Sequence, residues 1–236
     1  MGFRLSKRIY KIAEKAGEGD SIADIGTDHG YVPMILLRQG RISHAIMSDI
    51  SPDSLDKARN TFGISGLKAD PECFRVGDGL DTIAPGEVDT VVIAGLGGFT
   101  IIDILQNDIS KSKSFSRLVM QPRKFSGNLR YFLYTNGWDI IDEDLAPEGK
   151  FVCEVITAIP AEPAEREAPY PEESIIWKYP PEIVRADREL AAKRISWKIS
   201  SIEEQIENLS RSRADSSDTV NLLRQERQYL MDLLEE

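Results

Sequence analysis

Two carboxylates stand in a glycine-rich turn near the start of the chain. Residues 23–31 read Ala-Asp-Ile-Gly-Thr-Asp-His-Gly-Tyr and lie between an expected strand and an expected helix. A dinucleotide-binding turn needs a glycine at its second conserved position, where the backbone approaches a pyrophosphate, and Asp28 occupies that position here. A carboxylate about 4 Å from a phosphate charge is repelled by about 4 kcal/mol at an effective dielectric of 20. Asp24 and Asp28 therefore favour a cationic ligand over a dinucleotide.

Two further carboxylates follow later strands that the sequence predicts. Asp49 ends the second expected strand, with Ile50 beside it, and Asp78 and Gly79 come directly after the third. In an open parallel sheet the carboxyl ends of the strands meet at the edge that binds ligands. There Asp49 could accept both hydroxyls of a ribose, and Asp78 could accept an adenine amino group. A single acid after a strand is often only a helix cap. Acids at the ends of three strands, in register with one another, favour an edge of the sheet that binds a nucleoside.

A run of small residues follows the fourth expected strand. Residues 94–98 read Ala-Gly-Leu-Gly-Gly, and the scarcity of side chains at Ala94 and Gly95, before Leu96, lets a flat base or a methyl donor lie against the backbone. The alternative is a tight turn without a ligand. S-adenosylmethionine has an adenosine, an ammonium and a sulfonium but no phosphate. It therefore suits Asp24 and Asp28 where a dinucleotide does not.

The order of the predicted elements explains how these residues would meet. Strands alternate with helices, as a parallel sheet with crossover helices requires. The expected strands are 21–24, 44–49, 74–76, 90–94 and 118–121, and the expected helices are 31–38, 126–135 and one that starts at Ser51-Pro52. Two last strands, 138–145 and 151–159, are joined by a turn instead of a helix. A parallel sheet completed by an antiparallel hairpin predicts the Rossmann-like α/β fold of the class I S-adenosylmethionine methyltransferases.

The composition divides the chain into three parts. Residues 1–159 make the expected methyltransferase domain, and residues 160–181, rich in proline and glutamate, are expected to be a linker on the surface. In residues 182–236 apolar side chains recur at spacings of three and four, which predicts an antiparallel helical hairpin zipped as a coiled coil. The expected seam consists of Ile195, Ile199, Ile202, Ile206, Leu209, Val220, Leu223, Leu230 and Leu234.

Composition also excludes several classes of protein. No stretch approaches the length of an apolar membrane span and no signal segment opens the sequence, so we expect a cytoplasmic protein without a membrane partner. Cys73 and Cys153 stand apart from each other and from the two histidines, so we expect neither a disulfide nor a metal site. Both cysteines are expected in the core. We expect the chain to act as a monomer.

Positive charge gathers in two regions of an otherwise acidic chain. The net charge of −10 argues against a general nucleic-acid coat, which must neutralise many phosphates. One basic cluster consists of Arg4, Lys7, Arg8, Lys11 and Lys15, and the other, in a stretch without acids, of Lys111, Lys113, Arg117, Arg123, Lys124 and Arg130. Two local basic surfaces fit a selective contact with a polyanion, although a solvated helix face explains the first cluster equally well.

Over about its first 159 residues the sequence resembles the bacterial tRNA (adenine-22-N1)-methyltransferase family, known as TrmK. The motifs that carry the resemblance are Leu5-Ser6-Lys7-Arg8, residues 23–31 with Pro33, Gly77-Asp78-Gly79-Leu80, residues 93–98, Gln121-Pro122, and Gly149-Lys150-Phe151 with Glu154. The resemblance implies methyl transfer from S-adenosylmethionine to N1 of an adenine in the tRNA D-arm, at position 22, and a coiled coil that helps to hold tRNA. The sequence departs from the family at Arg123, where asparagine is usual, at Ile50, where valine is usual, and at Cys153, where tyrosine is usual.

The candidate site residues follow from the motifs together with this resemblance. We assign cofactor binding to Arg8, Asp24, Gly26, Asp28, Gly30, Asp49, Ile50, Asp78, Gly79, Ala94, Gly95 and Leu96. We assign roles in catalysis to Asp28, His29, Tyr31, Gln121 and Arg123.

The acceptor chemistry gives these catalytic candidates their roles. Adenine N1 has an in-plane lone pair and attacks a methyl group without losing a proton, so alignment supplies much of the rate. A paired base must first flip out, and His29 and Tyr31 would stack on it or hydrogen-bond to it. Gln121 and Arg123 would read the base and its flanking phosphate, and Asp28 would stabilise the cationic product. Each of the two residues also has a non-catalytic alternative. His29 could be a turn residue that only hydrogen-bonds the backbone, and Tyr31 could only pack at the start of its helix.

Two other functions fit parts of the sequence. A methyltransferase acting on another nucleobase or on a small molecule would use the same cofactor residues. The absence of an Asn/Asp-Pro-Pro-Tyr/Phe motif after the fourth expected strand disfavours methylation of an exocyclic amine but leaves ring nitrogens open. A non-catalytic nucleotide-binding or coiled-coil module would account for the helical hairpin but not for four aligned acids.

Overall fold

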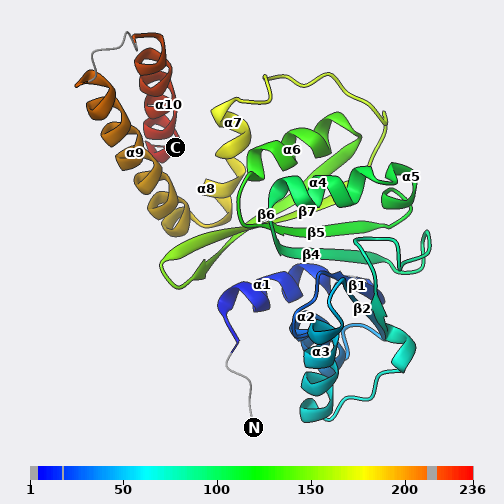
Figure 1. The fold of residues 1–236 in the computed structure, drawn as a ribbon. Helices are drawn as coiled ribbons and strands as arrows, with labels where there is room; N and C mark the ends of the chain where they lie inside the picture. Colours follow the sequence, from blue (N-terminus) through cyan, green and yellow to red (C-terminus); the bar gives the residue numbers. More distant parts are fainter. Residues whose placement is uncertain (1–4, 18, 212–216, 236) are drawn as a thin grey trace.

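The computed structural model describes residues 5–17, 19–211 and 217–235. Its centre is a seven-stranded sheet in the order β3-β2-β1-β4-β5-β7-β6, in which β1 to β5 are parallel and β7 runs against both of its neighbours (Figure 1). The strands are β1 (Ser21–Ile25), β2 (His44–Asp49), β3 (Phe74–Val76), β4 (Thr90–Leu96), β5 (Arg117–Pro122), β6 (Trp138–Glu148) and β7 (Phe151–Pro160). The predicted class I methyltransferase plan is confirmed.

Helices cover both faces of the sheet (Figure 1). One face carries α1 (Lys7–Ala16), α2 (Tyr31–Arg38) and α3 (Pro52–Ser65), and the other carries α4 (Gly98–Gln106), α5 (Ile109–Ser112) and α6 (Ser126–Thr135); a 3-10 turn, η1 (Pro71–Cys73), precedes β3. Leu36 and Leu55 are buried in the core of the first face, and Ile101 and Leu133 in the core of the second. The inner strands are apolar almost throughout because both of their faces are covered.

The strand order reverses between β1 and β4, and this reversal opens a crevice at the carboxyl edge of the sheet. The turn after β1 and the end of β4 meet there. Gly26 has a φ of +73°, and a Cβ on it would stand only 3.5 Å from the side chain of Leu96. The two glycine-rich motifs of the sequence therefore face each other across the crevice.

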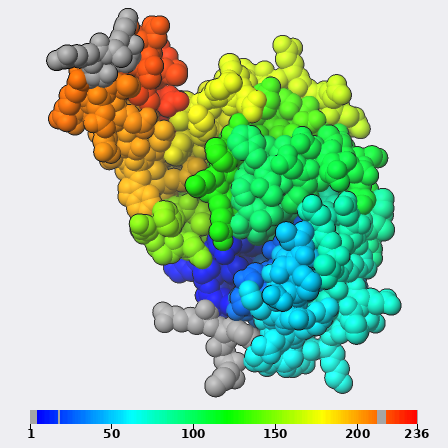
Figure 2. All heavy atoms as spheres, viewed as in Figure 1, coloured from blue at the N-terminus to red at the C-terminus, as the bar shows by residue number. Residues whose placement is uncertain are grey.

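The C-terminal helices form an arm. They are α8 (Glu182–Ala186), α9 (Arg188–Ser210) and α10 (Ser217–Glu235), and Figure 2 shows α9 and α10, in orange and red, projecting from the body of the molecule. The apolar cluster of the arm joins Leu145 of β6 to the buried side chains Ile195, Ile202, Leu223, Leu230 and Leu233. Leu233 takes the buried place near the end of α10, whereas Leu234, which we expected in the seam, is only partly buried.

The proline-rich segment before the arm is more than the surface linker that we expected. It contains α7 (Ile175–Lys178), which packs on α6. Trp177 of α7 is buried, with its ring centroid 5.9 Å from that of Tyr131 and 5.7 Å from that of Tyr134. One buried tryptophan anchors a segment that its proline content alone would leave on the surface, because the indole supplies a large apolar area.

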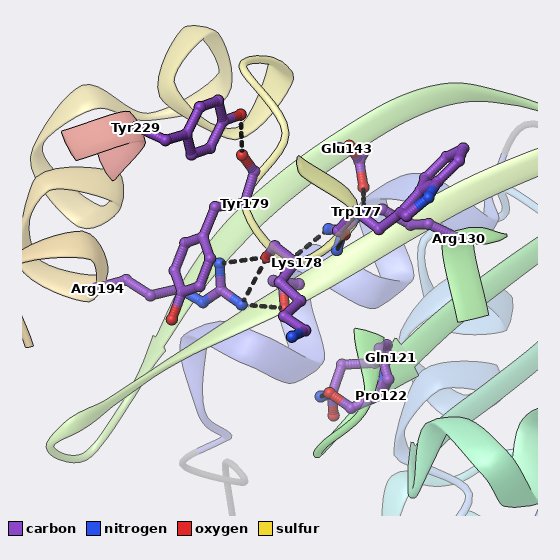
Figure 3. A network of polar contacts seen from close by, with 10 residues as sticks. Gln121, Pro122, Arg130, Glu143, Trp177, Lys178, Tyr179, Arg194 and Tyr229 are labelled. Atoms are coloured by element: carbon purple, nitrogen blue, oxygen red, sulfur yellow. Dashed lines mark hydrogen bonds and ion pairs between the residues drawn. The ribbon is translucent and has the colours of Figure 1, made fainter. Parts of the chain in front are cut away.

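A buried ionic network joins the arm to the body (Figure 3). Arg130 of α6 lies between Glu143 of β6 and Glu154 of β7, and it also donates a hydrogen bond to the Trp177 carbonyl at 3.0 Å. Arg194 of α9 reaches the other oxygen of Glu154 at 2.7 Å. Burial alone would raise the pKa of Glu154, but the charges of Arg130 and Arg194 hold it below its ordinary value. The arm is therefore connected to β7 by charge as well as by apolar packing.

Neither basic cluster is the open surface that the sequence predicted. In α1, Lys11 pairs with Asp144 at 2.8 Å and Lys15 pairs with Asp142 at 2.6 Å, because β6 runs beside this helix and presents its acids to it. Arg4 lies outside the described residues. In the second cluster Arg130 is buried in the network, while Lys111 and Lys113 donate hydrogen bonds to the carbonyls of Leu80 and Ala164. The exposed part of the second cluster that faces the crevice is reduced to Arg123 and Lys124.

The described residues can also be compared with the expectations about membrane spans, metal sites and the two cysteines. Among them no helix is both long enough and apolar enough to cross a bilayer, and no group of three or more potential ligand side chains is arranged to hold a metal ion. Cys73 is buried, as we expected. Cys153 is not a core residue, because it is only partly buried and lines a cavity of the candidate site.

Candidate active site

A cavity of about 380 Å³ occupies the crevice at the carboxyl edge of the sheet. It gathers most of the residues that the sequence assigned to cofactor binding, although these come from separate motifs. The predicted residues that line it are Arg8, Asp24, Gly26, Asp28, His29, Gly30, Tyr31, Ala94, Gly95, Leu96 and Arg123. The chain therefore folds its N-terminal helix, its two glycine-rich turns and the end of β5 around one space.

Asp24 is the buried acid of this cavity. Only 7% of the residue is exposed, and one carboxylate oxygen accepts a hydrogen bond from the Thr27 hydroxyl at 2.7 Å. Burial raises the pKa of Asp24 to about 6, the negative charge of Asp49 adds to the increase, and the Thr27 hydrogen bond opposes it. Burial makes the charged form of this carboxylate unfavourable, and a bound cation would offset that cost. Asp24 therefore favours a cationic ligand.

Asp28 occupies a more open position than we expected for a residue that acts on the acceptor. Its side chain is 59% exposed and lies 2.7 Å from the Lys57 ammonium and 3.2 Å from His29 Nε2. His29 and Tyr31 stack on each other, with ring centroids 4.9 Å apart and 13° between their planes. These three residues form one wall of the cavity, and the Lys57 pairing leaves less of the Asp28 charge for a ligand.

Glycine is required by the backbone at two turns of the cavity. Gly30, which precedes α2, has a φ of +64°, and a Cβ on it would stand 3.2 Å from Ala58 and Phe62. Gly95 has a φ of +80°, and the guanidinium groups of Arg8 and Arg123 lie over it. Only glycine adopts such φ values without a steric cost, so both turns are fixed by their sequence.

Asp49, Ile50, Asp78 and Gly79 lie outside the lining of this cavity. Asp49 ends β2, where its carboxylate accepts the Ser51 N–H at 2.7 Å and its carbonyl accepts the Gly77 N–H at 3.1 Å. Ile50 and Asp78 are exposed. The loops after β2 and β3 thus meet on the same sheet edge, next to the cavity rather than in it. Their assignment to the nucleoside end of a cofactor remains a prediction.

A second cavity, of about 490 Å³, adjoins the first on the side of the arm. Gln121 and Arg123, the predicted acceptor residues, line it together. Sequence reasoning missed most of its other lining residues, which come from β5, the loop before α6, the β6–β7 hairpin and α9: Pro122, Lys124, Phe125, Ser126, Glu148, Phe151, Val152, Cys153, Glu154 and Arg194. The family motif around Phe151 and Glu154 indicated part of this wall, but nothing local in the sequence connects Arg194 to it.

Three residues line both cavities: Arg8, Arg123 and Glu148. Arg8 donates a hydrogen bond to the Gln121 side-chain oxygen at 3.0 Å, and its guanidinium lies 3.5 Å from the Glu148 carboxylate. The Gln121 amide nitrogen in turn donates to the Pro122 carbonyl at 3.0 Å, which fixes the orientation of a fully buried amide. This wall therefore consists of a positioned amide, two cations and one carboxylate.

The wall retains unused hydrogen-bonding capacity. One oxygen of Glu148 and the hydroxyl of Ser6, which lines the first cavity, are both buried and have no hydrogen-bond partner among the described residues. Buried polar atoms are nearly always paired in folded proteins, so an unpaired one at a cavity indicates a ligand or ordered water.

Comparison with known proteins identifies the family to which this arrangement belongs. Residues 5–156 match the family described as a methyltransferase domain. The tRNA (adenine(22)-N(1))-methyltransferase of Bacillus subtilis is 35% identical over 167 residues, which cover 71% of this chain and 68% of that protein. The chain belongs to this methyltransferase family. The resemblance found in the sequence is thereby confirmed.

Solved structures of methyltransferases support the same fold over the whole chain. The crystal structure of the Bacillus subtilis m1A22 tRNA methyltransferase TrmK has a TM-score of 0.81 and 28% identity, and the match covers 99% of this chain and all of that one. The Streptococcus pneumoniae protein described as a putative tRNA (m1A22) methyltransferase in complex with S-adenosyl-L-methionine has a TM-score of 0.77 and 22% identity, covering 98% and 99%. These matches include the C-terminal arm, so the arm belongs to the architecture that the chain shares with them.

Proposed function

We propose that the chain transfers a methyl group from S-adenosylmethionine to N1 of an adenine in the D-arm of tRNA, at position 22. The observation that carries this proposal is the pair of adjoining cavities that share a wall of Arg8, Arg123 and Glu148. One cavity suits a cationic nucleoside, and the other offers an amide and cations to an incoming nucleotide. The Bacillus subtilis relative with the corresponding name supports the choice of substrate.

The residues of the first cavity fit the methyl donor. S-adenosylmethionine, when bound, supplies a methyl group activated by a positively charged sulfonium. Asp24 places a buried negative charge in the cavity, and the unpaired Ser6 hydroxyl and Glu148 oxygen supply hydrogen-bonding capacity. Arg8 is positioned to contact a carboxylate. Asp49 and Asp78, on the adjacent edge, would accept from ribose and adenine.

The residues of the second cavity would hold the acceptor and favour its attack. The fixed amide of Gln121 can donate to one edge of a flipped base, and Arg123 can contact the base or its phosphate. Adenine becomes cationic when N1 is methylated, so a nearby carboxylate stabilises the product-like transition state. We gave this role to Asp28, which lines the first cavity and pairs with Lys57; Glu148, which lines both cavities and pairs with Arg8, is a second candidate for it. No proton needs to be removed before the attack, so the reaction requires neither a general base nor a metal ion.

The remaining parts of the chain fit an enzyme that acts on a folded RNA. Residues 1–159 would perform the reaction, and residues 182–236 would help to hold tRNA beside the second cavity, into which Arg194 of the arm already extends. We infer that the protein works as a monomer. We place it in the cytoplasm, where its tRNA substrate is found.

Incubation with labelled donor and unmodified tRNA tests the proposed function. We expect one methyl group per accepted tRNA, located at N1 of adenine 22 when the modified nucleotide is mapped by mass spectrometry of nuclease fragments. Methylation at another ring nitrogen would refute the proposed position and indicate the alternative nucleobase enzyme, with Arg123 as the first residue to examine. Donor binding without methylation of any RNA would indicate a small-molecule methyltransferase or a binding module.

A further inference from the structure

Two exposed phenylalanines stand beside the second cavity, at the carboxyl edge of the sheet. Phe99 lies in the first turn of α4 and Phe125 directly precedes α6, and 46% and 53% of their surfaces are exposed. Their ring centroids are 4.6 Å apart with 43° between the planes, so they form a single aromatic surface. Scattered exposed apolar residues are ordinary on proteins, but a contacting aromatic pair at the rim of a functional cavity is a feature that needs a reason.

The backbone at Phe125 is held in an unfavourable conformation. Its φ of +60° and ψ of +37° are left-handed, and among the described residues other than glycine no second one has a positive φ. Bulky residues avoid this region because Cβ approaches the backbone. Strain of this kind persists only where the surroundings enforce it, and it is concentrated at functional sites.

The surroundings that enforce this conformation can be identified. The Arg123 N–H donates to the Leu96 carbonyl at 2.7 Å, and the Gly98 N–H donates to the Lys124 carbonyl at 2.8 Å. A Cβ on Gly98 would lie 2.3 Å from the Phe125 carbonyl oxygen, so this close approach requires a glycine there. The loop before α6 is therefore fastened to the start of α4, and the fastening presents the Phe125 ring to solvent beside Phe99.

Positive charge adjoins the aromatic surface. Arg123 and Lys124 immediately precede Phe125 and are exposed, and among the described residues no carboxylate lies within ion-pair distance of either side chain. An aromatic face next to unpaired cations matches a nucleotide, whose base stacks while its phosphate binds the cations. A protein partner could pack on the aromatic rings, but it would not explain the two cations beside them.

We infer that Phe99 and Phe125 form a stacking platform for an unpaired base of the RNA substrate, a nucleotide adjacent to the one that enters the second cavity. This inference rests on the proposed function, since it takes tRNA as the ligand. Stacking on an aromatic residue tolerates any base, so the platform would stabilise an opened D-arm without reading its sequence. It would thereby keep the target nucleotide from pairing again.

Binding of the full-length protein to a tRNA transcript that contains adenine 22 tests the platform. We expect Phe99→Ala and Phe125→Ala each to weaken tRNA binding roughly 5- to 150-fold, the range for the loss of one stacked base, with unchanged affinity for S-adenosylmethionine. The salt dependence should keep its slope in both variants. In Lys124→Gln it should instead decrease by about 0.7 to 0.9 per lost phosphate contact. Ile64→Ala, which removes an exposed apolar side chain from α3, is the matched control and should bind tRNA normally.

Two further measurements distinguish base stacking from a structural role of the two phenylalanines. Phe125→Trp should keep tRNA affinity, and its added fluorescence should be quenched when tRNA binds. Phe99 lies in a helix with ordinary backbone, so Phe99→Ala tests the platform even if Phe125→Ala folds poorly. Unchanged tRNA affinity in Phe99→Ala and Phe125→Ala, in a preparation whose parent methylates tRNA, would overturn the platform and leave the aromatic pair to a protein partner. A parent that methylates no tRNA would refute the proposed function itself.

Discussion

Asp24→Asn should make the free protein more stable while weakening its binding of the methyl donor. The carboxyl is buried and its pKa is raised from 3.8 to about 6 by that burial, so the folded state holds its proton more tightly than the unfolded state does. Stability is therefore lost as the pH rises through the window between these two values. The loss above pH 6 amounts to about 3 kcal/mol, from about 2.2 pKa units at 1.36 kcal/mol each.

The asparagine variant avoids this loss because its amide is neutral at every pH, and its side-chain oxygen can still accept the Thr27 hydrogen bond. In urea denaturation at pH 8 we expect the variant to exceed the parent by up to about 3 kcal/mol, and at pH 5 by roughly half of that. Asp89→Asn is the matched control at the opposite edge of the sheet. Asp89 accepts hydrogen bonds from Ser21 that lower its pKa, so its replacement should destabilise the protein at pH 8.

Donor binding should change in the opposite direction. Calorimetry at pH 8 should show roughly 10- to 100-fold weaker binding of S-adenosylmethionine to Asp24→Asn, the usual range for the loss of one charge-assisted contact. The affinity of the parent should decline as the pH falls below about 6, where Asp24 gains its proton, and this decline should disappear in the variant. A variant that is no more stable than the parent at pH 8, or that binds the donor equally well, would refute the role given to Asp24.

Further substitutions test other parts of the protein. Arg130→Met leaves Glu143 buried without its cation and should lower the free energy of unfolding, measured in urea, by about 3 to 5 kcal/mol. The control Arg227→Met breaks an exposed ion pair on the arm and should lower it by at most about 1 kcal/mol. Equal losses in the two variants would contradict the importance of burial. Glu148→Gln should lower kcat for tRNA methylation by roughly 100-fold, more than it changes KM, and an unchanged kcat would exclude Glu148 from stabilising the cationic product. Asp49→Ala removes the acceptor of the Ser51 N–H but should leave the protein folded, and it should weaken donor binding; calorimetry showing parental affinity would place the ribose elsewhere.

Much of the fold could be predicted because its signals are local. Buried parallel strands read as short apolar runs, and the turn between β6 and β7 replaces a helix, so both the sheet and its hairpin were recognisable in the sequence. The glycines at 26, 30 and 95 likewise stand where the backbone needs a positive φ. Much of the first cavity could be predicted for the same reason, because its two glycine-rich motifs follow β1 and β4 at the carboxyl edge of the sheet.

The second cavity and the ionic contacts could not be predicted, because they depend on partners far apart in the chain. Lys11 and its ion-pair partner Asp144 are more than a hundred residues apart in the sequence. The sequence therefore does not indicate that acids of β6 neutralise the basic side chains of α1. Arg194 reaches Glu154 only because the arm folds back on β6 and β7. Phe125 carries no sequence signal for a left-handed backbone, which the neighbouring loop imposes through Gly98.

Methylation of two matched tRNA transcripts tests the central claim most directly. One transcript carries adenine at position 22, and the other carries guanine there with its pairing partner adjusted to preserve the D-arm. The proposed function predicts that the full-length protein transfers one labelled methyl group from S-adenosylmethionine to the first transcript and none to the second. Equal methylation of both transcripts, or of neither, would contradict it.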